Sequence, residues 1–182
     1  MAELEARWRG FRVLSKPESP FCRAVDKALR VLSFGQMRTF LTRYITTFGR
    51  RIYVPSDWDR LPAGERYCIL RHEAVHVRQF RRLTWPGMTL VYLLLPLPVG
   101  LAAGRALLEW QGYRETLVSH FQVYGDDPRH FSRLKTDIVR RFTGPDYLWM
   151  WLPGRMVARA IDRTLEQLRA APPPPLDGPP PP

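Results

Sequence analysis

The sequence is poor in cysteine and in lysine, and each shortage narrows the class of protein. Its two cysteines, Cys22 and Cys68, are too few for the disulfide framework of a small secreted domain. Lysine occurs only as Lys16, Lys27 and Lys135, so the excess of 28 basic over 17 acidic residues, a net charge of +11, is mainly arginine. An arginine excess favours partners that present carboxylates, phosphates or an anionic lipid surface.

We also expect neither a signal peptide nor a nucleic-acid-binding function. Residues 1–10 contain no apolar segment of the kind found in a signal peptide, so we expect a cytoplasmic protein. No recognition helix, zinc finger or RNA-binding motif accompanies the arginines, which are scattered along the chain. We therefore expect no nucleic-acid partner, and a solvated basic surface is the simplest alternative to a specific anionic one.

The chain contains no internal repeat, and 182 residues are enough to bury the core of one domain. We expect an N-terminal arm over residues 1–18, which forms a docking segment or a short helix. A single domain should follow over residues 19–170. Residues 171–182 are rich in proline, cannot pack a core and are expected to be disordered.

The expected fold is mostly helical with a short β-hairpin, an α+β domain. Ser19 followed by Pro20 predicts the start of a helix that runs to about Phe34. β-Branched and aromatic residues over 44–47 and 51–54 flank Gly49, which predicts a hairpin. Further helices are predicted from about Glu65 to Leu83, from Val99 to Val123, from Phe131 to Phe142 and from Pro153 to Ala170.

Residues 84–104 carry no charge and are long enough to be considered for a membrane span. Three prolines, Pro86, Pro96 and Pro98, would break a regular spanning helix. We therefore predict a hairpin with a helical arm to about Leu95 and a turn at the last two prolines. It is either buried in the core or dipped into a bilayer. The aromatic residues of 146–152 are likewise core residues or a membrane anchor.

The most informative motif is His72-Glu73-x-x-His76, which lies within a segment of helical periodicity. On a helix, residues four apart share one face, so both imidazoles can point at one metal ion. Two such nitrogens suit Zn²⁺, and Glu73 between them is placed to activate a water. The alternative is a structural histidine pair. Cys68, one turn earlier, is interpreted as a small buried side chain instead of a fourth ligand.

A catalytic zinc usually has three protein ligands and an open position. No third histidine follows at the required spacing, and the next acidic residue is Glu109 within a predicted helix. Gly112, one turn later, would allow two helices to approach closely around a metal. Glu115 is the competitor, but it points to another face of the helix than Glu109. Glu109 as a surface charge near Arg105 is the remaining alternative.

These residues resemble those of the gluzincin zinc metallopeptidases, which are thermolysin-like in architecture. Glu109-Trp110-Gln111-Gly112 is similar to the glutamate helix of the CAAX-processing and related membrane members. The resemblance covers roughly residues 44–122, and it implies a zincin-like fold in which strand 51–54 pairs with substrate. Those membrane enzymes carry Asp one turn after the ligand Glu, where this chain has Tyr113.

The resemblance implies zinc-dependent peptide hydrolysis. His72, His76 and Glu109 would hold Zn²⁺, Glu73 would take a proton from the attacking water, and Tyr113 would bond a ligand or the reacting carbonyl oxygen. The implied partner is a peptide or protein substrate, cleaved in the cytoplasm or at the inner face of an anionic membrane. A non-catalytic, basic membrane-binding or scaffold protein is the alternative.

The zinc hypothesis also constrains the topology of residues 84–104. A single crossing of a bilayer there would place Glu109 about 30 Å from the two histidines, too far to share a metal ion. Either residues 84–104 form a hairpin, or Glu109 is not a ligand.

Overall fold

A computed structural model describes residues 11–32, 40–43, 45–93, 102–144 and 152–174. The chain divides into two compact units at Arg66 and Tyr67. The described part is mostly helical with one three-stranded sheet, which confirms an α+β fold. The expected arm within residues 1–10, the turn at 96–98, and most of the aromatic stretch 146–152 and of the tail lie outside the described residues.

The first unit contains the sheet, whose strands are β1 (Arg12–Ser15), β2 (Thr46–Phe48) and β3 (Arg51–Val54). The predicted hairpin is confirmed: β2 pairs antiparallel with β3, and Gly49 between them has the positive φ of 60° that favours glycine. β1 pairs with β3 in parallel and places β3 at the centre. Residues 12–15 are therefore a strand, which excludes the short-helix alternative for this part of the expected arm.

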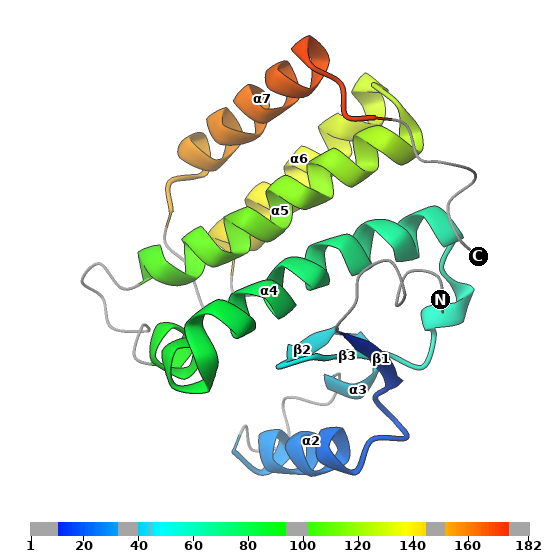
Figure 1. Cartoon of the computed structure of the whole chain (residues 1–182), viewed down its shortest axis with the longest axis vertical. Coiled ribbons are helices and arrows are strands. Elements are labelled where there is room, and N and C mark those ends of the chain that lie inside the picture. The colour runs from blue at the N-terminus through cyan, green and yellow to red at the C-terminus, as the bar shows by residue number, and fades with distance from the viewer. Residues whose placement is uncertain (1–10, 33–39, 44, 94–101, 145–151, 175–182) are drawn as a thin grey trace. The chain divides into compact units, whose positions relative to one another are not determined.

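Helices cover this sheet on one side in Figure 1, where α2 (Pro20–Leu32) and α3 (Phe40–Arg43) lie below the strands. α2 begins as predicted, because the Ser19 hydroxyl accepts a hydrogen bond from the backbone N–H of Cys22 at 3.3 Å. The Phe21 ring packs 5.1 Å from Phe48 and 5.9 Å from Tyr53. A short 3-10 helix, η1 (Trp58–Arg60), follows the sheet.

The second unit is an assembly of antiparallel helices. It contains α4 (Ala63–Leu93) from Tyr67 onwards, then α5 (Ala102–Tyr124), α6 (Pro128–Thr143) and α7 (Gly154–Ala170). Figure 1 shows α4 and α5 side by side and running in opposite directions, with α6 and α7 on the other side of α5. The predicted helices are confirmed to within a few residues at their ends.

α4 is interrupted at Thr84, where φ is 58° and ψ is 176°. The motif helix therefore ends at Leu83 as predicted, and a second helical segment continues to Leu93. This segment and α5 are helical, but the turn between them lies outside the described residues, so the hairpin itself stays a prediction. No helix of the described part is long and apolar enough to cross a membrane.

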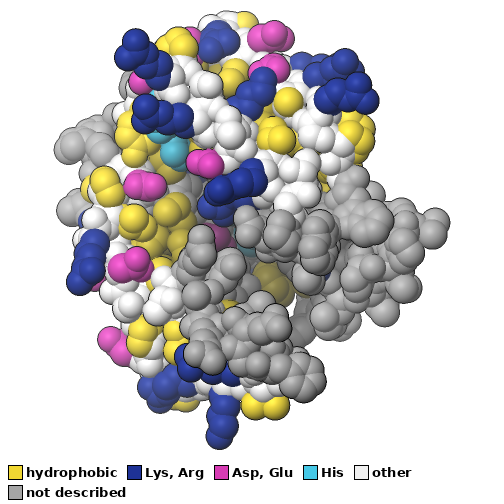
Figure 2. Space-filling model, turned by 180° about the vertical axis from the view of Figure 1, so that it is seen from behind, with side chains coloured by type: hydrophobic (Ala, Val, Ile, Leu, Met, Phe, Trp, Pro, Cys, Tyr) yellow, Lys and Arg dark blue, Asp and Glu magenta, His cyan; other side chains and the backbone are white. Residues whose placement is uncertain are grey.

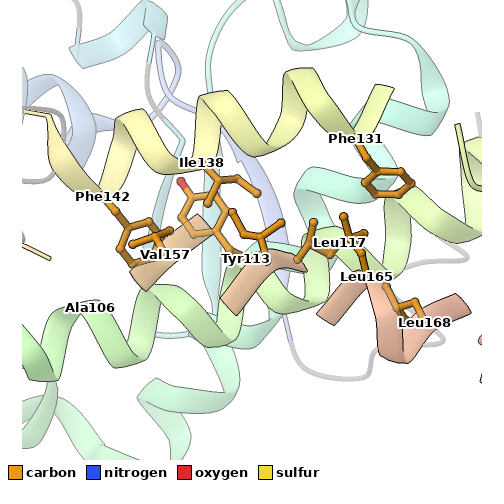
Figure 3. Close-up of a cluster of buried hydrophobic side chains, with 10 residues drawn as sticks. Ala106, Tyr113, Leu117, Phe131, Ile138, Phe142, Val157, Leu165 and Leu168 are labelled. Atoms are coloured by element: carbon orange, nitrogen blue, oxygen red, sulfur yellow. The ribbon is translucent and has the colours of Figure 1, made fainter. Parts of the chain in front are cut away.

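The core of the second unit lies between α5, α6 and α7 (Figure 3). Each helix contributes residues at a spacing of three, four or seven, which places them on one face. The buried cluster consists of Ala106, Tyr113 and Leu117 from α5, Phe131, Ile138 and Phe142 from α6, and Val157, Ile161, Leu165 and Leu168 from α7. α5 thus packs one face against this core and leaves another for α4.

Candidate metal centre

Three side chains that sequence analysis assigned to a metal converge between α4 and α5. His72 and His76 come from α4 and Glu109 from α5, all three are buried, and their ligand atoms lie within 4.8 Å of one another. The Nε2 atoms of the two histidines are 3.1 Å apart. Glu109 Oε2 is 3.8 Å from Nε2 of His72 and 3.6 Å from Nε2 of His76. These are the three atoms that would have to contact a common ion.

The spacing of these atoms fits a tetrahedral ion. Ligands about 2.0–2.1 Å from a tetrahedral Zn²⁺ are separated from each other by about 3.3 Å. The three separations here, 3.1, 3.6 and 3.8 Å, lie around that value. An ion could therefore be accepted with small movements of the side chains.

Hydrogen bonds on the far side of each imidazole determine its tautomer. The Thr116 hydroxyl donates to the carbonyl of Gly112 at 3.2 Å, so its oxygen accepts from Nδ1 of His72 at 3.0 Å. The Gln79 amide nitrogen donates to the carbonyl of Leu108 at 3.0 Å, so its Oε1 accepts from Nδ1 of His76 at 2.8 Å. With Nδ1 protonated, each neutral ring directs the lone pair of Nε2 at the centre.

The electrostatics of the metal-free centre are those of a site that attracts a cation. Burial and the neighbouring His76 lower the pKa of His72 to about 3. Burial also lowers the pKa of His76, but the carboxylate of Glu109 at 3.6 Å, with the charge of Glu73, outweighs it and raises that pKa to about 9. Two nitrogens and a carboxylate that face each other in a buried space are stabilised by a shared positive charge.

A glycine makes this approach of the two helices possible. A Cβ added to Gly112 of α5 would lie 2.7 Å from Cε1 and 2.8 Å from Nε2 of His72. Atoms of a side chain do not approach a ring so closely, so glycine is required here. The expectation that Gly112 allows close packing of helices around the centre is confirmed.

Glu73 and Tyr113, the two residues predicted to act in catalysis, lie beside the histidines. Glu73 follows His72 on α4, is partly exposed, and is near enough for its charge to act on His76. Tyr113 is buried in the core cluster with its ring 4.8 Å from that of His72, edge to face. Figure 3 shows its side chain among the buried residues of this cluster. Its proposed bond to a ligand or substrate stays a prediction.

The competitors of the predicted ligands have other contacts. Glu115 forms an ion pair with Arg71, which also donates to the hydroxyl of Tyr67 at 2.6 Å and to Gln122 at 3.2 Å. This network joins α4 to α5 one turn from the centre. Cys68 is buried and does not belong to the three-residue cluster, the only one found within the described ranges.

The two histidines that sequence analysis left unassigned form a separate pair. His120 of α5 and His130 of α6 are joined by a 2.8 Å contact between Nδ1 and Nε2, and their rings stack at 5.0 Å. Burial, with a contribution from His130, lowers the pKa of His120 to about 4. These residues are not members of the metal cluster.

Sequence analysis missed Thr116 and Gln79, which hold the tautomers. A signal for them was present in the spacing. Gln79 follows His76 by three residues and His72 by seven, and Thr116 follows Glu109 by seven. Polar residues repeated at helical spacing on the stripe that bears the ligands are candidates for their hydrogen-bond partners. Comparisons of the chain with protein-family models, with curated protein sequences and with solved structures found no match.

Proposed function

We propose that the protein is a zinc-dependent peptide hydrolase with a zincin-like centre formed by His72, His76 and Glu109. The observation that carries the proposal is the convergence of these three ligand atoms, with both Nε2 lone pairs directed at one point. Two imidazoles and a carboxylate are a donor set of catalytic zinc. When bound there, Zn²⁺ would polarise a carbonyl group and lower the pKa of a water.

The roles of the protein's own residues follow from their positions. Glu73 is one residue from a ligand and partly exposed, so it can accept a proton from water and return it to the leaving amine. Thr116 and Gln79 hold the two imidazoles in the tautomer that binds metal. A general base beside the ligands favours a catalytic over a structural centre, because a structural site needs no base.

The substrate class and the place of action are part of the same proposal. A peptide substrate and the cytoplasmic location rest on the resemblance and on the composition. Association with a membrane rests on the net charge of +11. On the face shown in Figure 2, Lys and Arg side chains are spread among acidic and apolar ones. That distribution does not favour the alternative of a nucleic-acid-binding protein.

Metal content tests the centre directly. We expect about one zinc per chain by elemental analysis of the protein after reconstitution and removal of free metal. Glu109→Ala should lower zinc affinity by more than the roughly 10–100-fold loss that follows removal of an outer partner. Glu115→Ala is the matched control, because it removes a carboxylate of the same helix that is bound to Arg71 instead.

The result of this experiment is decisive in either direction. Zinc lost in Glu109→Ala and kept in Glu115→Ala would establish the ligand set. A wild-type protein that binds no zinc after reconstitution would rule out the hydrolase, and the non-catalytic basic membrane-binding protein would then be the better account.

Protonation of the centre gives a second test. In the metal-free protein at pH 7.5, we expect His76 to be an imidazolium because its pKa is about 9, and His72 to be neutral because its pKa is about 3. Two-bond ¹H–¹⁵N spectra distinguish these states, and His120→Gln and His130→Gln variants identify the other two rings. Zinc should convert both ligands to the neutral form with a proton on Nδ1. Two neutral ligand rings at pH 7.5 without metal would contradict this electrostatic description.

A further inference from the structure

A pocket lies between α4 and α5, apart from the three proposed metal ligands. Its volume is about 540 Å³. Arg78 and Arg82 of α4 and Arg114 of α5 contribute its positive charge. Arg78 and Arg82 are four residues apart and therefore share one face of α4. The volume is in the range of pockets that bind small molecules.

The charge of the pocket is not neutralised by its own lining. Glu115 is the acidic residue of the lining, and it is held by Arg71 in an ion pair. Among all residues that the structure describes, none forms a hydrogen bond or an ion pair with Arg82 or Arg114. These two exposed guanidinium groups are therefore available to an anion, and their planar donors suit a phosphate or a carboxylate.

The same pocket has an apolar part. Val75 and Leu83 of α4 and Leu108 and Val118 of α5 line it beside the arginines. Leu83 is 36% exposed, which is high for a leucine that borders a cavity. A ligand that fills the pocket would gain by covering these side chains as well as by pairing with the arginines. A purely ionic ligand would leave the apolar wall in water.

One residue connects the pocket to the metal centre. Gln79 lines the pocket, accepts a hydrogen bond from His76, and donates to Oε1 of Gln111 at 3.2 Å. This hydrogen bond uses the side-chain oxygen of Gln111 and leaves its amide N–H₂ group out of the bond. The N–H₂ group can therefore donate to a ligand. The pocket therefore offers a neutral donor beside its arginines.

We propose that this pocket binds an amphiphile that carries a phosphate monoester, with the phosphate on Arg82 and Arg114 and the apolar part on Leu83, Leu108 and Val118. A phosphate monoester has a charge of about −2 near neutral pH, which two arginines balance. The inference goes beyond the hydrolase proposal and does not depend on it. The ligand is either a phospholipid of a bilayer or a soluble phosphorylated molecule, and the two share this chemistry.

Binding of a short-chain lipid tests the proposal. The probe is dihexanoyl phosphatidic acid, used below the concentration at which it forms micelles and titrated calorimetrically into the full chain. We expect saturable binding that is about tenfold or more weaker in Arg82→Gln/Arg114→Gln, because hydrogen bonds to charged groups are lost. The control is Arg133→Gln/Arg159→Gln, which removes the same charge from exposed positions of α6 and α7 and should bind like the wild type.

Binding of two other ligands and of vesicles defines what the pocket recognises and can overturn the proposal. Inorganic phosphate lacks the apolar part and should bind at least about tenfold more weakly than the acid. Dihexanoyl phosphatidylcholine should also bind at least about tenfold more weakly, because its phosphodiester carries a single negative charge and its choline cation is repelled by the arginines. Equal binding of either, equal loss in both arginine pairs, or no saturable binding would refute it. Vesicles containing phosphatidic acid show whether the ligand comes from a membrane or from solution. Binding to them with the same arginine dependence indicates a membrane ligand, and binding of the free molecule alone indicates a soluble one.

Discussion

Replacing Glu73 with glutamine should lower the rate of peptide hydrolysis by about 10²–10⁴-fold, the contribution of a general base. Glutamine has nearly the same shape but cannot accept a proton from water. Because Glu73 is not among the three convergent ligands, zinc content should stay at the wild-type level. The measurement is kcat/KM on a peptide substrate, with zinc per chain determined on the same samples.

Measuring both kcat/KM and zinc content separates a loss of the general base from a loss of the metal. Glu115→Gln is the control, since it changes a partly buried carboxylate of α5 that is bound to Arg71. A Glu73→Gln protein with full zinc and undiminished hydrolysis would remove Glu73 from the mechanism. A variant that loses its zinc would show that Glu73 contributes to binding the metal instead.

Replacing Gly112 with alanine should weaken zinc binding by about 100-fold, the upper end of the range for an outer-shell change. The added Cβ would lie 2.7 Å from the ring of His72. The ring cannot yield easily, because Thr116 holds its Nδ1 and the Tyr113 ring packs edge to face with it, the ring centroids being 4.8 Å apart. The imidazole must turn away from Glu109 or the helices must separate.

Stability should change much less than metal affinity in this variant. Overpacking a buried site costs roughly 1–3 kcal/mol. Alanine in place of glycine within a helix returns about 1 kcal/mol. Gly154→Ala is the matched control, because its Cβ would meet only methyl groups of Val139 and Thr143 at 3.3 and 3.4 Å. Unchanged zinc affinity in Gly112→Ala, measured by competition with a chelator, would contradict the close packing described here.

Local patterns predicted the part of the site that lies on one helix. His72 and His76 share a face because of helical periodicity alone, and the structure places their Nε2 atoms 3.1 Å apart. Glu109 could be selected because it is the next acidic residue after the motif and lies within a predicted helix, and Gly112 because it is one turn beyond Glu109. These inferences need only the order of residues in the chain and the geometry of each helix taken by itself.

Features that depend on how distant segments pair could not be predicted in this way. The parallel pairing of β1 with β3 joins Arg12 to Arg51 in register, and no turn between them indicates it. The contacts of Thr116 with His72 and of Glu115 with Arg71 each span 44 residues. Which face of α5 meets α4 is determined by the packing of α5 against α6 and α7, and that packing is a property of the whole unit.

The positions of the two cysteines make them suitable probes of local opening of the structure. Neither forms a disulfide among the described residues, and Cys22 on α2 and Cys68 on α4 are each 0% exposed. A buried thiol reacts with an alkylating reagent only when the surrounding structure opens, so the speed of labelling reports local opening. Cys68 precedes His72 by one turn, whereas Cys22 lies in the other unit. The natural chain therefore contains a reporter near the candidate metal centre and a reference remote from it in sequence, without any engineered label.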